Sequence, residues 1–325
     1  MSVVTDDVKI ATKLISSGHL CAIPTETVYG LAAAASNPDA IKRVFEAKGR
    51  PLDHPLIVHV ADFERAMLWV SNLPDWAKVL ADSCWPGPLT LVANRSSLAS
   101  DLITGGQDTV AVRVPNHPKT LELLKALADA GIYGVVAPSA NLFGQVSPTN
   151  ATHVLTDLGE YLLAHDDGIL DGGSCQVGIE STIVLATSNV PRALRPGVIT
   201  DELIESITGL AMDHNEQQTP RVSGALASHY APKAKVHVLT DVSHQNFQAR
   251  SGFIALQNIP TPDSLIRLAT PIDVSEFAAC LYEAMRQADT LNLENIYIIT
   301  PQATGIGEAI IDRVTKAAHE KSGGR

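Results

Sequence analysis

The sequence predicts an α/β fold divided between a larger N-terminal domain and a smaller C-terminal domain. Short apolar stretches typical of strands alternate with amphipathic helical stretches along most of the chain. Residues 211–232 interrupt this alternation with a polar segment that has no clear period and contains prolines and a glycine. The 325 residues, 45% of them hydrophobic and 18% charged, suffice for two buried cores. We expect one domain at 1–210, a linker at 211–232 and a second domain at 233–325.

Apolar composition marks the expected strands. In the first domain they lie within residues 19–25, 55–60, 89–95, 109–115, 133–139 and 181–186. The second domain has strand-like stretches at 235–240, 252–256 and 295–300 and helical ones at 273–290 and 307–320. This order of strands and helices in the second domain is typical of a small α/β domain with a mostly parallel sheet. The rhythm of the first domain is less regular.

A basic turn follows the predicted helix at 39–48. Ile41, Val44, Phe45 and Lys48 recur at helical spacing, and the glycine at position 49 is a natural helix end. The turn "AKGRPLDHPL" (47–56) then carries Lys48, Arg50 and His54. Cations at a helix C-terminus interact favourably with the helix dipole, which explains any single one of them.

Arg50 is harder to explain in this way. It precedes a proline, which disfavours the helical region, so its side chain is expected to point into the adjoining loop. A guanidinium on a rigid turn suits phosphate or carboxylate recognition.

Strand alternation places polar side chains on one face of the expected sheet. Val110, Val112 and Val114 share a face, so Thr109 and Arg113 lie on the other.

In the same way, Ile57 and His59 lie opposite Leu56, Val58 and Val60, and Ser181 begins another strand. A lone polar residue on a strand is more often a structural group than a ligand. Several of them on different strands would form a pocket if their faces coincide.

Three stretches are richer in turn residues than a bare scaffold needs. They are "PTETVYGL" (24–31), "APSANLFGQVSPT" (137–149) and "RALRPGVI" (192–199). Ordinary turn and capping chemistry explains any one of them. Loops at strand ends of α/β sheets are where ligands usually bind, so together they favour a binding site.

Composition limits the partner and the cellular context. The net charge of −11 argues against a broad basic face for nucleic acid and leaves room for a local pocket for a small anion. The four cysteines are scattered without a CxxC pair, which is typical of reduced thiols. The first twenty residues lack a secretory pattern and no apolar stretch is long enough to span a membrane, so we expect a cytoplasmic protein.

The motifs together resemble the YrdC-like family. "PTETVYGL", "AKGRP" followed by "PLIVHV", "WPGPLTLV", "VAVRVPNHP", "APSANLFGQVSPT", "VGIESTIV" and "LRPGVI" occur in the family's order, and "SGALASHYAP" with "GIGEAIIDRVTKAA" resembles the long, two-domain form of threonylcarbamoyl-AMP synthases. The resemblance implies an N-terminal YrdC-like domain with a twisted mixed sheet and a small Rossmann-like C-terminal domain. It also implies that residues 211–232 lie over the active-site opening.

The family makes L-threonylcarbamoyladenylate from L-threonine, bicarbonate or CO2, and ATP, and it releases pyrophosphate. This is the first step of threonylcarbamoyladenosine formation in tRNA, so a downstream tRNA threonylcarbamoyl transferase machinery is an implied partner. Mg2+ is expected through the ATP phosphates rather than at a protein metal site.

The resemblance also implies roles for individual residues. Lys48 and Arg50 match the family's Lys-x-Arg signature and are the expected catalytic cations. Threonine binding is expected of Thr27, His59, Arg113 and Ser181, and ATP binding of Arg50, His54, Thr109, Ser139, Asn141, Ser147, Arg195 and Tyr230.

The sequence departs from the family at two positions. Phe143 stands where the family often has serine, and His54 where it often has asparagine.

Two other function classes are alternatives to the enzyme. A non-enzymatic RNA-binding YrdC-like module is the main alternative, with direct tRNA binding as its consequence. A hydrolase is disfavoured because no GxSxG motif or recognisable triad motif is present.

Overall fold

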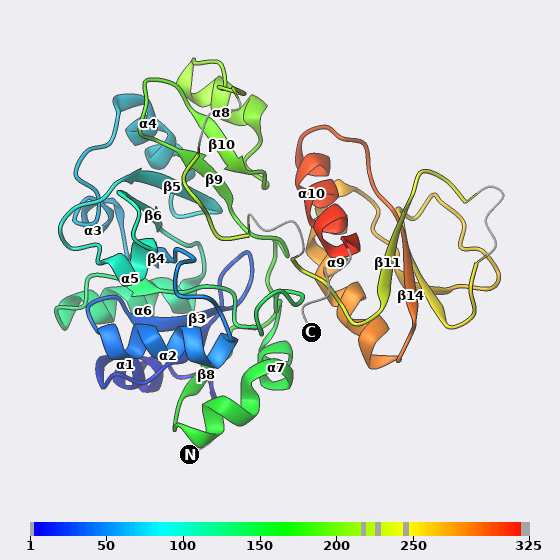
Figure 1. The fold of residues 1–325 in the computed structure, drawn as a ribbon, viewed down its shortest axis with the longest axis horizontal. Coiled ribbons are helices and arrows are strands. Elements are labelled where there is room, and N and C mark those ends of the chain that lie inside the picture. Colours follow the sequence, from blue (N-terminus) through cyan, green and yellow to red (C-terminus); the bar gives the residue numbers. More distant parts are fainter. Residues whose placement is uncertain (1–2, 216–218, 225–228, 243–246, 320–325) are drawn as a thin grey trace.

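The computed structural model describes residues 3–215, 219–224, 229–242 and 247–319. Their strands form two sheets that lie side by side along the long axis of the molecule (Figure 1). The first sheet has ten strands in the order β1-β8-β2-β3-β7-β4-β6-β5-β9-β10, and the second has four in the order β11-β14-β12-β13. The predicted α/β class with two sheets is therefore confirmed.

The first sheet is mixed. Among its neighbours, β4 runs parallel to β6 and β5 parallel to β9, whereas β7 runs antiparallel to both β3 and β4. Its strands are β1 (Val4–Thr5), β2 (Cys21–Ile23), β3 (Gly30–Ala34), β4 (Ile57–His59), β5 (Leu89–Asn94), β6 (Thr109–Arg113), β7 (Val135–Val136), β8 (Gly168–Leu170), β9 (Thr182–Leu185) and β10 (Arg192–Arg195).

Eight helices accompany this sheet within the described residues. They are α1 (Val8–Ser16), α2 (Pro38–Lys48), α3 (Phe63–Ala66), α4 (Asp75–Cys84), α5 (Asp101–Thr104), α6 (Pro118–Asp129), α7 (Ala151–Ala164) and α8 (Asp201–Thr208). The predicted helix before the basic turn is α2. The side chain of Asn37 caps its start, and Gly49 ends it with a left-handed φ of 61°.

The two faces of the first sheet have different surroundings. Val58, Val110 and Val112 belong to the largest hydrophobic core, together with residues of α2 and α4. Ile57 and Ala111 point the other way, into a small separate cluster. The predicted alternation of β4 and β6 is thus confirmed, and the polar residues of these strands lie on the face away from the large core.

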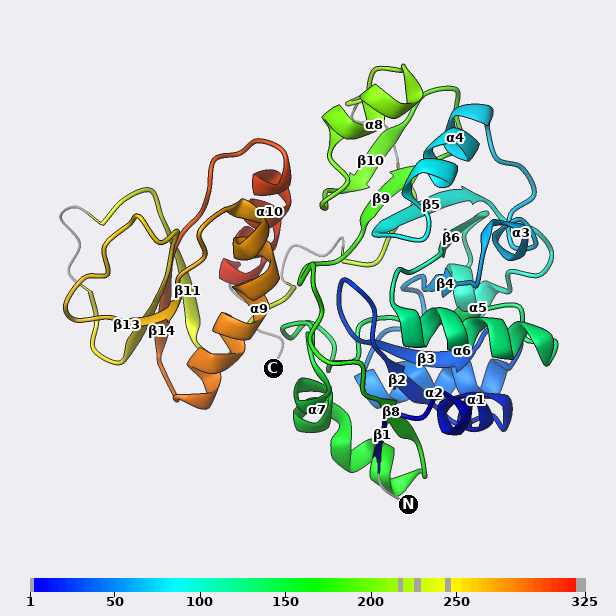
Figure 2. The ribbon, with the colours of Figure 1, turned by 180° about the vertical axis from the view of Figure 1, so that it is seen from behind.

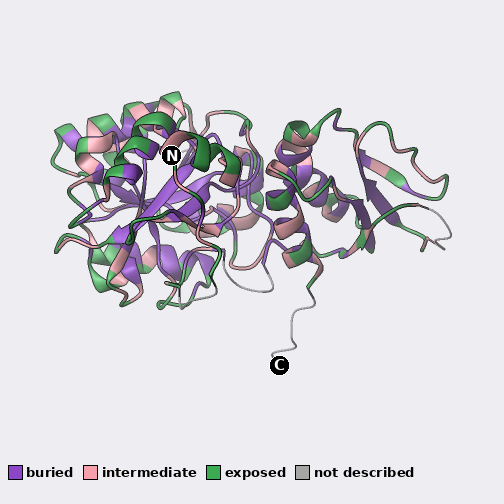
Figure 3. Cartoon of the chain, turned by 90° about the horizontal axis from the view of Figure 1, so that it is seen from above, coloured by how far each residue is buried: buried purple, intermediate pink, exposed green. Residues whose placement is uncertain are grey.

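The strand pairs of the second sheet are all parallel, whereas the order of its elements predicted a mostly parallel sheet. It contains β11 (Lys235–Leu239), β12 (Ser251–Ile254), β13 (Ile266–Ala269) and β14 (Asn295–Ile299), with α9 (Val274–Thr290) and α10 (Ile306–Ala318). Both helices lie between this sheet and the first domain (Figures 1 and 2). The strands β12 and β14 are buried, and exposed residues lie on the outer surfaces (Figure 3).

The first domain approaches α9 at a glycine. Gly178 has a φ of +76°, and a Cβ placed on it would lie 2.5 Å from both the Cα and the carbonyl oxygen of Ala279. Only glycine allows this backbone conformation and this close approach without strain. The segment around Gly178 therefore packs directly on the second domain.

Some strands were missed at the sequence level. The residues of β3 are glycine, leucine and alanines, which carry no strand signal, and β8 is only three residues long. The segment 192–199, interpreted as a turn, begins with the strand β10, and β13 was not predicted.

Two other expectations can be compared with the structure. All four cysteines are free thiols. No helix within the described ranges combines the length and apolar character needed to cross a membrane.

Candidate functional site

A small cavity of about 40 Å³ lies on the face of the first sheet that points away from the large core. Strands and loops of the first domain and the linker segment 211–232 line it. The lining residues are Thr25, Thr27, Val28, Gly30, Ile57, His59, Arg113, Ala137, Pro138, Ser139, Glu180, Ser181, Arg195, Ser223, His229 and Tyr230. It has room for about one or two water molecules. All four residues expected on the threonine side and three of those expected on the nucleotide side are among them.

Arg113 and His59 come from neighbouring parallel strands. They are paired in the register of β4 and β6, at the last residue of each strand. The Arg113 guanidinium donates to Glu26 Oε1 at 2.7 Å and to the carbonyl oxygen of Gly87 at 3.3 Å. These bonds use two of the five N–H groups of a guanidinium, so others can reach a ligand carboxylate.

His59 is a buried, neutral imidazole. Burial, reinforced by the positive charge of Arg113, lowers its pKa to about 3. A neutral ring beside a guanidinium can accept a hydrogen bond from a ligand amine or hydroxyl.

Hydroxyl groups also lie at the cavity. The Thr25 and Thr27 hydroxyl oxygens lie 2.8 Å apart. The Ser181 hydroxyl lies 2.7 Å from that of Thr90, and Arg195 donates to Ser181 Oγ at 3.1 Å. Arg195 also donates to the Ser181 carbonyl oxygen, which fixes the start of β9 against the end of β10.

Lys48 is buried behind the cavity wall. Its ammonium group donates to the carbonyl oxygens of Ser139 and Asn141, both at 2.6 Å. Burial, together with the charge of Arg50, lowers its pKa well below the usual value. Lys48 thus holds the Ser139–Asn141 loop, and it is not among the residues that line the cavity.

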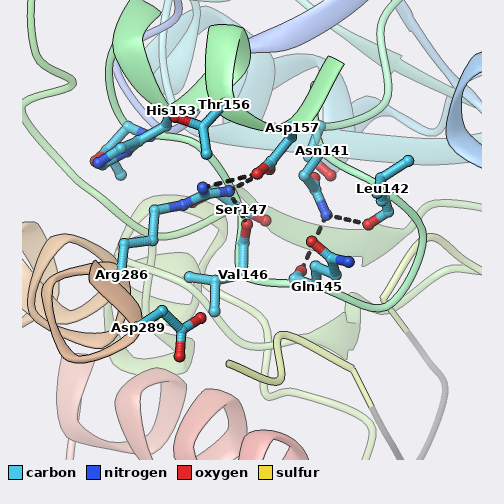
Figure 4. Close-up of polar contacts among 12 residues, drawn as sticks. Asn141, Leu142, Gln145, Val146, Ser147, His153, Thr156, Asp157, Arg286 and Asp289 are labelled. Carbon is cyan, nitrogen blue, oxygen red and sulfur yellow. Dashed lines mark hydrogen bonds and ion pairs between the residues drawn. The ribbon is translucent and has the colours of Figure 1, made fainter. Parts of the chain in front are cut away.

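The same loop is closed by the Asn141 amide. Asn141 Nδ2 donates to the carbonyl oxygens of Leu142 at 2.7 Å and Gln145 at 2.9 Å (Figure 4). Its Oδ1 is buried and has no hydrogen-bond partner within the described part of the chain. A buried acceptor in this state is a candidate contact for a ligand donor.

The two positions that depart from the family contact each other. The Phe143 and His54 rings meet edge to face at 5.2 Å, and the Phe143 ring lies 6.0 Å from that of His229. The Arg50 guanidinium lies 5.6 Å from the Phe143 ring centre and donates to the carbonyl oxygen of Pro55 at 2.9 Å. Arg50 therefore lies beside an aromatic cluster outside the cavity lining.

His229 and Tyr230 extend the linker segment into the cavity wall. Their rings are 4.1 Å apart, and burial lowers the pKa of His229 to about 3 and raises that of Tyr230 to about 12. A Cβ on Gly224 would lie 2.3 Å from the Tyr230 hydroxyl oxygen, so a glycine is needed there. The serine of the "SHYAP" motif, at position 228, lies outside the described residues.

Sequence reasoning missed the two carboxylates of the site. Glu26 was noted only as a turn residue, and Glu180 was not singled out, although both are buried and paired with arginines. Burial alone would raise the pKa of Glu180, but the charges of Arg313 and Arg195 and hydrogen bonds to it lower the pKa to about 2.

Two residues predicted for ATP lie in other surroundings. Ser147 is buried and donates to Glu180 Oε1 at 2.6 Å. Thr109 lines a separate small recess with Gln107 and Arg221. Neither lines the cavity.

The described residues contain no group of three or more histidine, cysteine, aspartate or glutamate side chains placed to hold a metal ion. Glu180 lines the cavity and is paired with Arg313, and Glu26, beside the cavity, is paired with Arg113. This donor set does not suit a metal ion held by the protein alone.

Buried arginines, a neutral histidine and hydroxyls thus surround a small cavity in a two-domain α/β protein. These are the features of a site that binds a small anionic ligand.

Comparison with known proteins identifies the family. The family described as "Telomere recombination" matches residues 13–197, and that described as "Threonylcarbamoyl-AMP synthase, C-terminal domain" matches residues 199–319. The chain belongs to this Sua5–YciO–YrdC family, in its form with the additional C-terminal domain, which confirms the resemblance found in the sequence.

Full-length relatives agree with this assignment. Threonylcarbamoyl-AMP synthase of Pyrococcus abyssi is 37% identical over 96% of this chain and 94% of that protein. The protein of the same name from Bacillus subtilis is 37% identical over 97% and 94%. The crystal structure of P. abyssi Sua5 complexed with L-threonine has a TM-score of 0.82 and 35% identity, and covers 96% of this chain and 94% of that one.

Proposed function

We propose that this chain is a threonylcarbamoyl-AMP synthase, which joins L-threonine, bicarbonate or CO2, and ATP into L-threonylcarbamoyl-AMP and pyrophosphate. The main support for this proposal is that Thr27, His59, Arg113 and Ser181 line one cavity. The chain is also similar along its length to a protein crystallised with L-threonine. The site, the name of the full-length relatives and the two matched domains all favour the enzyme over an RNA-binding module.

Threonine would bind against the strand face. Arg113, fixed by Glu26, would clamp the carboxylate, as a guanidinium does with parallel hydrogen bonds. The neutral His59 ring and the hydroxyls of Thr27 and Ser181 would orient the amine and the side-chain hydroxyl.

ATP would bind beside the loop that Lys48 holds. Ser139 and Arg195 line the cavity. Asn141 Oδ1, which has no hydrogen-bond partner among the described residues, belongs to the same loop as Ser139. Arg50, His54, Thr109 and Ser147 would support the nucleotide from behind this wall, and Lys48 would act by fixing the loop. The cavity is far smaller than the roughly 300–1,000 Å³ of ordinary ligand pockets, so this wall has to move when ATP enters.

The proposed reaction needs no protein nucleophile. The threonine amine adds to CO2 and gives a carbamate with loss of a proton. A carbamate oxygen then forms a bond to the α-phosphorus as the bond from that phosphorus to the bridging oxygen breaks and pyrophosphate leaves. The chain's own residues supply alignment and positive charge opposite the phosphates.

Mg2+ would arrive with the ATP phosphates. Because Glu180 and the nearby Glu26 are paired with arginines, the described residues offer no set of free carboxylate ligands there. Magnesium commonly keeps water ligands and uses substrate phosphates in such sites.

We further propose a separate role for each of the three segments of the chain. Residues 1–210 would carry the catalytic site, 211–232 would form a lid, and 233–325 would form the C-terminal domain. Ser223, His229 and Tyr230 of the lid segment line the cavity, which supports a role in excluding water from the mixed anhydride. The product would pass to a tRNA threonylcarbamoyl transferase machinery.

The test is pyrophosphate release from ATP and bicarbonate with L-threonine, L-serine or no amino acid, with mass detection of the adenylate. We expect release that depends on threonine and a product of the mass of threonylcarbamoyl-AMP. A folded protein that releases no pyrophosphate under any of these conditions, and binds RNA in a salt-sensitive way, would support the RNA-binding module instead.

A further inference from the structure

Glu180 is a carboxylate of the cavity wall whose partners come from both domains. Its Oε1 accepts from Ser147 Oγ at 2.6 Å. Its Oε2 accepts from the Tyr282 hydroxyl and from Arg313 Nε, both at 2.9 Å. Tyr282 lies on α9 and Arg313 on α10, so two helices of the second domain meet at a residue that lines the cavity.

Arg313 touches two further parts of the cavity wall. Its Nη2 donates at 3.0 Å to the carbonyl oxygen of Pro196, which follows Arg195. Its guanidinium lies 5.5 Å from the centre of the Tyr230 ring, and that ring stacks on Tyr282 at 5.7 Å. The Arg313 residue is 0% exposed. A side chain from the second domain therefore contacts the segments that carry Glu180, Arg195 and Tyr230.

The residues held by these contacts adjoin two side chains that line the cavity, Ser181 and Arg195. Ser181 follows Glu180 in the chain, and Arg195 binds both the Ser181 hydroxyl and its carbonyl oxygen. The positive charges of Arg313 and Arg195 lower the pKa of Glu180 despite its burial, which favours the ionised carboxylate. A buried charge of this kind is costly without its partners, so loss of a partner should displace the segment.

Another contact between the domains lies further from the cavity. Arg286 of α9 pairs with Asp157 of α7 at 2.5 Å and donates to the Val146 carbonyl oxygen (Figure 4). Arg286 and Asp157 are not among the residues that line the cavity. Docking of the two domains thus does not depend on the Glu180 contacts alone.

We propose that Tyr282 and Arg313 are positioning residues for threonine binding: they hold the Glu180 carboxylate and thereby fix Ser181 and Arg195. The second domain then contributes to the affinity of a site whose ligand-facing side chains all belong to the first domain and the linker. This inference rests on the proposed function, because threonine is taken as the ligand of that wall.

The test compares Tyr282→Phe with Tyr297→Phe in the full chain. Tyr282→Phe removes the hydroxyl that binds Glu180 and keeps the ring that stacks on Tyr230. Tyr297→Phe is the matched control, since its hydroxyl accepts from the Gln248 backbone N–H within the second domain, in a separate core cluster. L-Threonine binding is measured by calorimetry, and the unfolding temperature of each variant by fluorescence.

We expect Tyr282→Phe to weaken threonine binding between about 2-fold and 30-fold, the range found for residues that couple to a distant site. Tyr297→Phe should bind as the unaltered protein does, with a similar unfolding temperature. Arg313→Lys keeps a positive charge but loses the fork that reaches both Glu180 and Pro196, so it should weaken binding further.

Three outcomes are distinguishable. If Tyr282→Phe binds threonine as tightly as Tyr297→Phe, the positioning role is wrong and the proposed function stands. If Tyr282→Phe only lowers the unfolding temperature without changing threonine affinity, its hydroxyl is purely structural and the inference is equally overturned. If the unaltered protein binds no threonine, the proposed function falls, and the positioning role falls with it.

Discussion

The two halves of the predicted site differ in their relation to the cavity. The residues predicted for threonine, Thr27, His59, Arg113 and Ser181, all line it. Of those predicted for the nucleotide, Ser139, Arg195 and Tyr230 line it, whereas Lys48, Arg50, His54, Thr109, Asn141 and Ser147 do not. The threonine half is formed around strand ends, and the nucleotide half is formed largely by loops that bind one another.

The difference indicates where the site has to change on ligand binding. Arg113 and His59 sit at the ends of paired strands, whose hydrogen bonds fix them before any ligand arrives. The Lys48 ammonium and the Asn141 amide instead donate hydrogen bonds to carbonyl oxygens of the loop, and the cavity beside them is about 40 Å³. The strand ends therefore form the more rigid half of the site, and we expect the loops around Lys48 and Asn141 to move when ATP enters.

Arg113→Ala should produce the largest effect. It removes the proposed carboxylate clamp and leaves Glu26 buried without its ion-pair partner. Loss of one partner of a buried charge pair costs about 2–5 kcal/mol in binding, which corresponds to roughly 30-fold to several-thousand-fold in affinity. We expect threonine-dependent pyrophosphate release to fall by a factor in this range.

Arg95→Ala is the matched control for that measurement. Arg95 pairs at 2.6 Å with Asp101, whose side chain is 76% exposed, and such a pair contributes little to stability. Pyrophosphate release should stay close to that of the unaltered protein. Equal activity of Arg113→Ala and Arg95→Ala would remove Arg113 from the threonine site.

Arg113 also illustrates what the sequence could predict. The valines at alternate positions of β6 indicate that Arg113 shares a face with other polar strand residues, because strand periodicity is a local property. Its partner Glu26 lies 87 positions away in the chain. Nothing in the local pattern around either residue shows that they meet.

Lys48 and Glu180 show the same limit more strongly. A lysine at the end of α2 is consistent with helix-dipole stabilisation and with phosphate binding, and only the fold shows that its acceptors are carbonyl oxygens 91 and 93 positions away. Glu180 depends on Arg313 of the other domain. Whether a buried ion contacts ligand or protein is decided by tertiary packing, which a single sequence does not display.

Lys48→Met should have a smaller effect, and mainly on the nucleotide half. Methionine fills a similar volume but offers no donor to the Ser139 and Asn141 carbonyl oxygens, and unsatisfied buried acceptors cost about 1–3 kcal/mol each. Relief of the buried charge offsets part of this cost. We expect ATP affinity to fall roughly tenfold, with threonine affinity in calorimetry close to unchanged.

Lys42→Met on the same helix is the control for Lys48→Met. Lys42 is exposed and pairs with Asp39 one turn earlier, so its loss should alter neither affinity. A Lys48→Met protein that loses threonine and ATP affinity equally would contradict the division of the site into a more rigid half and a loop half.

Phe143→Ser should produce the smallest effect, and it tests the aromatic contacts within the nucleotide half. The substitution introduces the residue that the family often has, and it removes the ring that contacts His54, His229 and Arg50. Aromatic pairs contribute about 0.5–1.5 kcal/mol each, so we expect the KM for ATP to change by roughly 2-fold to 12-fold. Leu142→Ser, at an exposed neighbour in the same loop, is the control.

Because Phe143 contacts both His54 of the basic turn and His229 of the linker segment, Phe143→Ser combined with His54→Asn should change the KM for ATP by no more than Phe143→Ser alone. Additive effects of the two substitutions would mean that each ring acts separately on the nucleotide and that the aromatic contact between them has no role in holding the wall.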